Sequence, residues 1–362
     1  MSTEVDGLGF VGITWQRGYG RVLCSTAKPE EKLFEFGSPP SGSVSANAHS
    51  GVTLDTSWDL AYYTETGVVT ELTWKSDTVA GKFWPQDRHY TAFHWSATDK
   101  SLLAARMDSA TVDKYGAPVK NSRVLVDPIQ YSIGSPTANT PFSDIALGPE
   151  KTILFGLQES ASGTSLAWGK LQPAHEPSVA GTGGASSVDF GVARWLAVSP
   201  TSGDTFVMGT PEGNAGKIQR FNATQTKSTD AIAAPAGWQC YGRPVIATAA
   251  NRQYCCVPVR KGTGKDSVWG IAVVDILDFT AKQAAVISLS DAYGVAPLAV
   301  NPSNGKLYAI KIFSSSPGKT GLEVVAANPA KPTENPTTVT TWHSSLDIYS
   351  DAPEHLWCFA WR

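Results

Sequence analysis

The chain contains two near copies of one segment, Ala197-Val-Ser-Pro-Thr-Ser-Gly-Asp204 and Ala299-Val-Asn-Pro-Ser-Asn-Gly-Lys306, which begin 102 residues apart. Weaker versions surround Ala146 and Ala247, so the four alanines lie 51, 50 and 52 residues apart. Repeats of about 50 residues with strand-like content are typical of β-propeller blades. The sequence therefore predicts an array of similar β-sheets.

Each unit follows the same order of predicted strands. A strand of small residues comes first, and in the last unit it is followed by strands near 306–310, 321–325 and 337–342. Small residues suit the first strand because inner strands crowd around the axis of a propeller. Read backwards, the same order predicts three earlier inner strands: Val11–Trp15, Val52–Trp58 and Tyr90–Trp95.

We count seven units, or six if the short early units merge. The C-terminal segment His355–Arg362 is strand-like, and the first unit is one strand short, so the two ends are expected to share a blade. Such pairing closes the ring and removes exposed sheet edges. The predicted fold is all-β, a β-propeller of seven (alternatively six) four-stranded blades closed by the C-terminal strand, with residues 1–362 forming a single domain.

The stretch Leu60–Trp74 shows the hairpin character of the units. Two β-prone runs, one with Tyr62 and Tyr63 and one with alternating polar residues, flank the turn Glu65-Thr-Gly67. A short Gly-containing connection between such runs predicts a β-hairpin.

The composition agrees with short strands and many turns. Apolar residues make up 42% and charged residues 17%, with 33 Gly and 23 Pro in 362 residues. The net charge of −3 argues against a nucleic-acid partner. No apolar stretch is long enough to cross a bilayer, and Met1–Asp6 lacks the features of a secretion signal. We expect no membrane partner and a cytoplasmic protein, or a secreted one if a signal peptide was removed.

The five Cys and six His show no metal or catalytic signature. Cys255 and Cys256 are adjacent in a predicted strand and should point to opposite faces, so buried free thiols are favoured over disulfides. We expect no metal and no cofactor. Several aromatic and His side chains fall on or near predicted inner strands and can line a central channel: Trp15, Trp58, His94, Trp95, His355 and Trp361. For each of them, packing within or between blades is the simpler interpretation.

A second candidate site follows from the first two units, where Arg21 and Glu35 precede a Trp74 that stands three residues after Glu71. This arrangement resembles the repeat of the fungal fucose-specific lectins of the Aleuria type, mainly over residues 9–95. Each site in that family combines an Arg on the second strand, a Glu on the third and an aromatic residue from the next blade. The resemblance implies a sugar site at Arg21, Glu35 and Trp74.

The repeats depart from that family's pattern elsewhere. Leu60 stands where the second unit needs an Arg, and Ser38 stands where the first blade needs an aromatic residue.

The sequence therefore leaves three functions open. The first is a lectin-like, carbohydrate-binding propeller with at most one intact site for a small glycan. The second is a cofactor-independent enzyme, such as a cyclase of secondary metabolism, that binds an apolar small molecule in the central funnel. The third is a protein-interaction scaffold.

Overall fold

The computed structural model describes the two parts of the chain in different detail. Before residue 140 it describes residues 8–14, 19–24, 32–36, 59–63, 69–74, 90–96, 101–106, 109–115, 124–125 and 129–133. It then describes most of 140–343, with longer gaps at 174–182, 210–215 and 224–230, and finally 356–361. Before residue 103 it describes the backbone of these strands and the burial of a single side chain, His94.

The described strands form seven antiparallel or mixed sheets. Blade 1 has the order β3–β2–β1–β30 and contains β1 (Leu8–Thr14), β2 (Tyr19–Cys24), β3 (Lys32–Phe36) and β30 (Leu356–Trp361). Blade 2 contains β6 (Tyr90–Ser96), β7 (Ser101–Arg106), β8 (Thr111–Tyr115), β10 (Ile129–Ser132) and β14 (Gln172–Pro173). Blade 3 contains β11 (Phe142–Leu147), β12 (Ile153–Ser160), β13 (Gly163–Lys170) and β15 (Gly183–Ser187).

The remaining sheets follow in chain order, except for one. Blade 4 contains β16 (Trp195–Val198), β17 (Thr205–Gly209), β18 (Lys217–Phe221) and β19 (Ile232–Ala233). Blade 5 contains β20 (Trp238–Cys240), β21 (Val245–Ala249), β22 (Arg252–Lys261), β23 (Val268–Asp275) and β24 (Ala285–Leu289). Blade 6 contains β25 (Gly294–Val295), β26 (Ala299–Val300), β27 (Leu307–Ser316), β28 (Lys319–Ala327) and β29 (Thr337–His343). The seventh sheet contains β4 (Asp59–Tyr63), β5 (Val69–Trp74) and β9 (Val124–Leu125).

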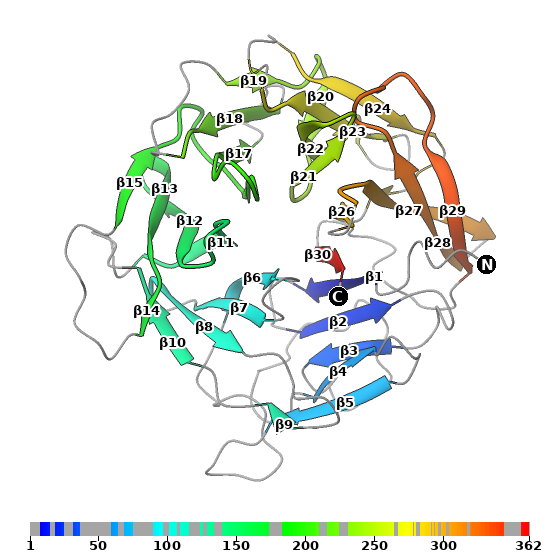
Figure 1. The fold of residues 1–362 in the computed structure, drawn as a ribbon. Helices are drawn as coiled ribbons and strands as arrows, with labels where there is room; N and C mark the ends of the chain where they lie inside the picture. The colour runs from blue at the N-terminus through cyan, green and yellow to red at the C-terminus, as the bar shows by residue number, and fades with distance from the viewer. Residues whose placement is uncertain are drawn as a thin grey trace.

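One strand of each blade lies at the axis of the propeller (Figure 1). Each contacts the next around the ring, in the order β30, β6, β11, β16, β21 and β26, and β26 contacts β30. The C-terminal strand is hydrogen-bonded to β1, so the first and last strands of the chain share blade 1. The protein is a β-propeller, and its described inner strands number six.

The predicted hairpin in Leu60–Trp74 is present, but it supplies no inner strand. β4 pairs with β5 from Asp59↔Thr73 to Tyr63↔Val69. β4 contacts β3, the outermost strand of blade 1, and Figure 1 shows this sheet outside the ring. The expected inner strand Val52–Trp58 lies outside the described residues. The described strands thus form seven sheets, six of which supply the inner strands, so the ring agrees with the alternative of six blades and the seventh sheet lies outside it.

The position of β30 shifts every other strand of blade 1 outward by one. We expected Val11–Trp15 to be an inner strand, but β1 is second from the axis because β30 occupies the inner place. Tyr90–Trp95 is an inner strand as predicted, within β6.

The repeat alanines mark inner strands, as the spacing predicts. Ala146, Ala197, Ala247 and Ala299 lie in β11, β16, β21 and β26, and all four are buried. The turn within each near copy contains the same backbone hydrogen bond: the Gly203 amide donates to the Ser199 carbonyl at 3.1 Å, and the Gly305 amide donates to the Asn301 carbonyl at 2.7 Å. Both glycines have positive φ, 73° and 69°, which a Gly adopts at little cost.

Apolar clusters fill the spaces between neighbouring blades. Cys256 belongs to the cluster that joins blades 5 and 6, whereas Cys255 belongs to the cluster that joins blades 4 and 5. Adjacent strand residues point to opposite faces, so the two thiols serve two different interfaces, as predicted. Cys240, Cys255 and Cys256 are free and buried.

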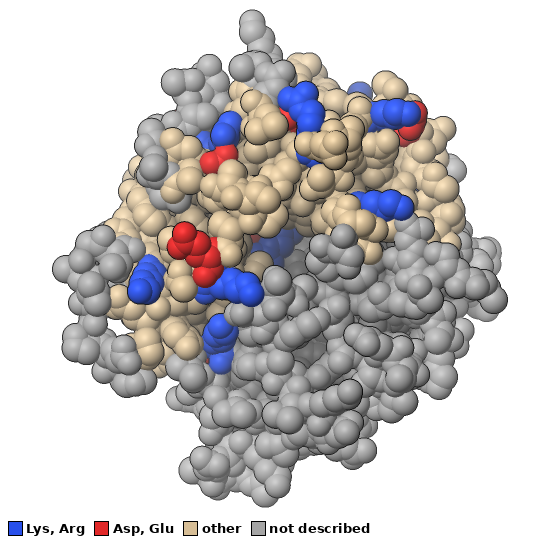
Figure 2. Space-filling view, in the orientation of Figure 1, with Lys and Arg blue, Asp and Glu red and all other residues tan. Residues whose placement is uncertain are grey.

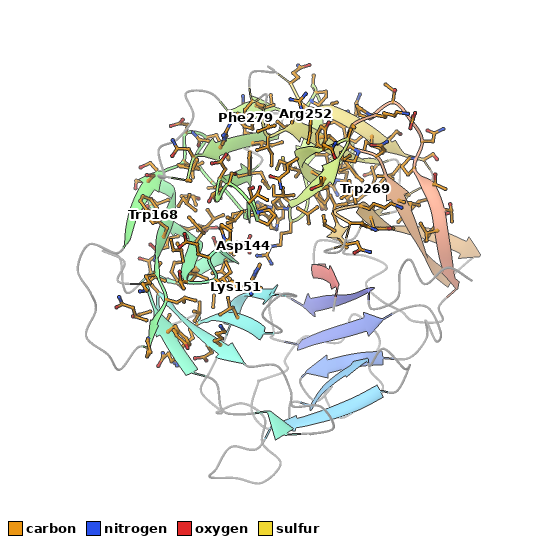
Figure 3. All side chains as sticks on the ribbon, in the orientation of Figure 1. Asp144, Lys151, Trp168, Arg252, Trp269 and Phe279 are labelled. Atoms are coloured by element: carbon orange, nitrogen blue, oxygen red, sulfur yellow. The ribbon has the colours of Figure 1, made fainter. Side chains whose placement is uncertain are left out.

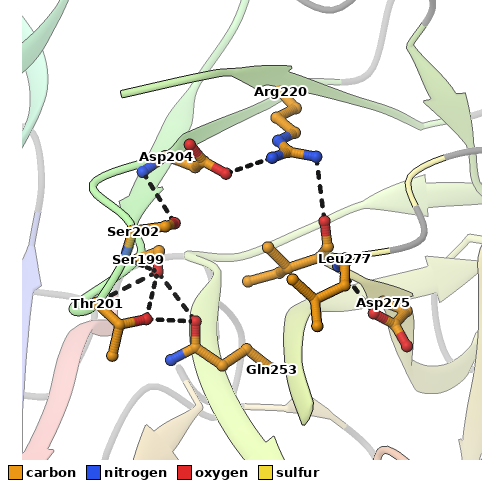
Figure 4. Close-up of polar contacts among 9 residues, drawn as sticks. Ser199, Thr201, Ser202, Asp204, Arg220, Gln253, Asp275 and Leu277 are labelled. Carbon is orange, nitrogen blue, oxygen red and sulfur yellow. Dashed lines mark hydrogen bonds and ion pairs between the residues drawn. The ribbon is translucent and has the colours of Figure 1, made fainter. Parts of the chain in front are cut away.

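Polar side chains also tie blade 4 to blade 5, at the turn between β16 and β17 (Figure 4). The Ser199 and Thr201 hydroxyls donate to Gln253 Oε1 at 3.1 and 2.8 Å. Arg220 pairs with Asp204 at 2.6 Å and donates to the Ile276 carbonyl at 3.1 Å. Each bond crosses from one blade or strand to another, so the network fixes how the two blades meet.

Basic and acidic side chains of the described part are interspersed on the face shown in Figure 2. Among the described residues, no helix is long and apolar enough to cross a membrane.

Candidate functional site

A buried ion pair near the axis of the propeller joins the inner strand β11 to the segment that leads into the inner strand β21. Asp144 is the third residue of β11, and Arg243 lies in the short segment between β20 and β21. Pro244 follows Arg243 and favours an extended backbone there, which carries the chain directly into β21. Arg243 Nη2 lies 3.0 Å from Asp144 Oδ1, and it also donates to the Ile145 carbonyl. Figure 3 shows Asp144 near the centre of the ring.

The Asp144 carboxylate also binds a third inner strand. Its Oδ2 accepts a hydrogen bond from the Leu196 amide of β16 at 2.9 Å, and its Oδ1 accepts from the Ile145 amide at 2.9 Å. The side chain is fully buried, and this burial raises its pKa to about 6, although Arg243 and the two amides act in the opposite direction. One carboxylate therefore connects blades 3, 4 and 5.

His94 on β6 adds a fourth inner strand to this cluster. Burial and the positive charge of Arg243 both disfavour the imidazolium, and they lower the His94 pKa to about 3. The residue as a whole nevertheless keeps some accessible surface. At neutral pH it is therefore an uncharged imidazole, with one N–H donor and one acceptor nitrogen. We refer to His94, Asp144 and Arg243 as the axial cluster.

The structure places the predicted channel residues unequally. His94 and Trp95 lie on the inner strand β6, and Trp361 lies on the inner strand β30. The side chains of Trp95 and Trp361, and the residues Trp15, Trp58 and His355, lie outside what the structure describes. Of the six candidates, His94 alone is thus placed in a described cluster of side chains.

The second predicted site has a different position from the one its resemblance implies. Arg21 on β2 is the register partner of Glu35 on β3, so the two residues are cross-strand neighbours. Because β30 is the innermost strand, they lie on the third and fourth strands of blade 1 rather than on the second and third. Trp74 ends β5 in the sheet outside the ring, not in the next blade around it. The side chains of all three residues are outside the described part.

No group of three or more His, Cys, Asp or Glu side chains in the described part of the chain is arranged to hold a metal ion.

Asp144 and Arg243 were not among the residues that the sequence singled out. Their one sequence signal is a break in the repeat: two residues before the marker alanines stand Asp144, Trp195, Val245 and Pro297. A charged residue at a position that is otherwise apolar in the other units points to a role specific to one blade. The partner of Asp144 could not be found in this way, because Arg243 lies far away in sequence and outside the repeated strand.

These features define the class of protein as a β-propeller with a buried polar cluster at its axis. No protein-family model matches the chain, and no curated protein does. Among solved structures, an ACO/RPE65 chimera is 12% identical over 100% of this chain and 93% of its own, with a TM-score of 0.51.

Two further structures are similar over most of their length. The periplasmic gluconolactonase PpgL of Pseudomonas aeruginosa is 15% identical over 93% of this chain and 96% of its own, with a TM-score of 0.49. The hydrazine synthase of Kuenenia stuttgartiensis is 10% identical over 95% of this chain and 88% of its own, with a TM-score of 0.48. At such low identity, the likeness to the chimera bears on the fold alone and agrees with a β-propeller. None of the three is a fucose-specific lectin.

Proposed function

We propose that the protein binds a small molecule at the axis of the propeller, next to His94, and acts on it as an enzyme without a cofactor. The observation that carries this proposal is the state of His94, which is uncharged, partly accessible and held beside a buried ion pair on inner strands. A polar group of this kind on an inner strand is available to a ligand in a way that the fully buried Asp144 is not.

The chemistry follows from the charge balance of the axial cluster. Burial, assisted by the positive charge of Arg243, lowers the pKa of His94 and keeps its imidazole neutral, and Asp144 holds Arg243 in place through the 3.0 Å contact. A neutral imidazole in a fixed position can donate a hydrogen bond to a carbonyl or hydroxyl oxygen that gains charge during a reaction. His94 is then the group that touches the ligand, and Arg243 and Asp144 are positioning residues. A rearrangement or cyclisation of a bound conformer fits this arrangement because it needs mainly orientation and one donor.

The test is binding of a library of small apolar molecules that carry one carbonyl or hydroxyl group, measured by thermal shift and followed by a structure of the best complex. We expect the ligand at the axis, and we expect His94→Phe to weaken binding or turnover while His94→Gln keeps part of it. A Gln side chain still donates a hydrogen bond, whereas Phe fills the space without one. Ligands that bind equally well to both variants, or that bind between blades, would rule out an axial site at His94.

Sugar binding at Arg21, Glu35 and Trp74 remains a second candidate, favoured by the cross-strand register of Arg21 and Glu35. A guanidinium and a carboxylate side by side can form charge-assisted hydrogen bonds to adjacent ring hydroxyls. A glycan array tests this directly: binding that Trp74→Ala abolishes would support it, and the absence of binding to any sugar would count against it.

A further inference from the structure

A cluster of one basic and two aromatic side chains lies on blade 5, away from the axial cluster. The guanidinium carbon of Arg260, near the end of β22, lies 3.8 Å from the centre of the Tyr241 ring and 5.7 Å from that of Trp269. The two rings meet edge to face, with centres 5.1 Å apart and an interplanar angle of 81°. Arg260 and Trp269 are direct register partners across β22 and β23. The guanidinium is thus held over an aromatic platform that two strands and the segment after β20 build together.

The cluster faces the space between blades 5 and 6. Trp269 belongs to the apolar cluster that joins these blades, and Tyr241 packs against it. Arg260 follows Tyr254 and Cys256, which belong to the same cluster, at intervals of two residues along β22. Side chains two apart share a face of a strand, so Arg260 lies on the face that is turned to blade 6. Figure 3 shows Trp269 between β23 and β27.

Arg260 has no acidic partner among the described residues. Its Nε is buried without a hydrogen-bond partner, while the residue as a whole keeps accessible surface. Arg220 and Arg243, by contrast, are both paired with Asp residues. A buried donor without a partner costs free energy that a bound acceptor would recover. Stacking on an aromatic face leaves the N–H groups in the guanidinium plane free to bind a planar anion.

The charge on the facing strand decides which anion fits. Lys311 of β27 lies on the face turned to blade 5, two residues after the core residue Ala309, but its Nζ pairs with Glu323 at 2.9 Å. Among the described side chains on these two faces, Arg260 is therefore the positive charge that lacks compensation. We propose that Arg260, Tyr241 and Trp269 form a binding site for the carboxylate group of a small organic acid. A single guanidinium matches a monoanionic carboxylate, whereas a phosphate dianion calls for more than one cation or several amide donors.

The experiment is calorimetric titration of the full chain with benzoate and with glucuronate, each compared with its neutral analogue, benzyl alcohol or glucose, and with inorganic phosphate. We expect at least one acid to bind and the neutral analogues not to bind. Arg260→Gln should lower the affinity for the acid at least about tenfold, because it removes a charge-assisted bidentate interaction. Arg260→Lys should give an intermediate loss, since it keeps the charge without the planar fork.

The matched control is Arg252→Gln. Arg252 lies on the same strand, is half exposed and pairs with Asp275 at 2.8 Å. The control variant should leave the affinity for the acids unchanged, and the melting temperature of each variant reports whether the blade is intact. The proposal is overturned if neither acid binds at millimolar concentration, if phosphate binds more tightly than both acids, or if a folded Arg260→Gln protein binds them as well as the Arg252→Gln protein. None of these outcomes depends on His94, so failure here is distinct from failure of the axial site.

Discussion

The Asp144 carboxylate of blade 3 accepts a hydrogen bond at 2.9 Å from the Leu196 amide of blade 4, and it thereby ties two inner strands that share no sheet. Such a bond joins residues 52 positions apart, about one repeat. The same carboxylate holds Arg243, the residue before Pro244 at the start of blade 5. A single side chain that the neighbouring units do not repeat therefore connects three blades at the axis.

Removal of Arg243, the ion-pair partner of Asp144, should lower the free energy of unfolding. Arg243→Met removes the cation and leaves a buried carboxylate with two amide donors, so we expect the stability to fall by roughly 3–5 kcal/mol. The midpoint of urea denaturation measures the change. In the double variant with Asp144→Asn, the neutral amide no longer needs a cation, and part of the loss should return. A loss in the double variant equal to the sum of the losses in Arg243→Met and Asp144→Asn alone would show that the pair contributes no coupling.

The cost of Arg243→Met should also depend on pH. The folded-state pKa of Asp144, about 6, is raised above the ordinary value of 3.8, so protonation favours the folded state and that contribution is lost as the pH rises through 6. Without Arg243, which lowers this pKa, it should rise further. Arg243→Met should thus destabilise the protein less at pH 5 than at pH 8, which urea denaturation at the two pH values measures. A loss of the same size at both pH values would contradict this.

The titration of His94 should change the folding stability with pH in the opposite direction to that of Asp144. Its folded-state pKa of about 3 lies below the ordinary 6.5, so the unfolded chain takes up a proton that the folded protein does not. The contribution of His94 to stability is therefore present above pH 6.5 and is lost as the pH falls toward 3, by at most about 1.4 kcal/mol per pH unit. Between pH 6 and 4 the protonation of Asp144 offsets part of this loss.

The test for His94 compares the variant His94→Gln with the wild-type protein in denaturation experiments between about pH 7.5 and about pH 4.5. This range spans the titration of a free imidazole. The stability of the variant relative to the wild type should increase as the pH falls, because Gln has no proton to gain. A difference that stays constant with pH would mean that His94 is protonated in the folded protein as readily as in the unfolded chain.

Local patterns predicted the repeated part of the fold well. The marker alanines, the Gly203 and Gly305 turns and the opposite faces of Cys255 and Cys256 depend on a few neighbouring residues and on the two-residue period of a strand. The position of β30 at the axis depends instead on pairing between the two ends of the chain. That pairing moves Arg21 and Glu35 outward by one strand, which a count of units along the sequence does not reveal.

The axial cluster was less predictable for a related reason. Arg243 donates to the Ile145 carbonyl across 98 residues, and no spacing rule connects such positions. His94 was found because it lies on a predicted inner strand, but its lowered pKa follows from its burial and from Arg243, which lies in no strand. Arg260 was missed because its stacking on Tyr241 depends on how the segment after β20 folds back over β22.

The thiols of blade 5 should be inert in the folded protein. Cys240, Cys255 and Cys256 are buried, and burial raises the pKa of each thiol, that of Cys240 to about 12. The thiolate is the reactive form. A colorimetric thiol reagent at pH 8 should therefore modify at most two of the five cysteines quickly and all five after unfolding in urea. Fast reaction of three or more thiols in the native protein would contradict the packing of blade 5.

A side chain at Gly156 should destabilise blade 3 because it would clash with the ring of Phe142. A Cβ at Gly156 of β12 would fall well inside van der Waals contact with the ring of Phe142, which is fully buried on the adjacent β11. Gly156→Ala should therefore destabilise the protein by about 1–3 kcal/mol through overpacking, even though alanine usually stabilises a backbone relative to glycine. Phe142→Leu alone should also destabilise, since it leaves a cavity in the core. If the clash with the ring is the cause, the double variant should be more stable than the sum of the two losses predicts, by an amount that a double-mutant cycle measures. Additive losses would place the cost of Gly156→Ala in the backbone and not in the contact with Phe142.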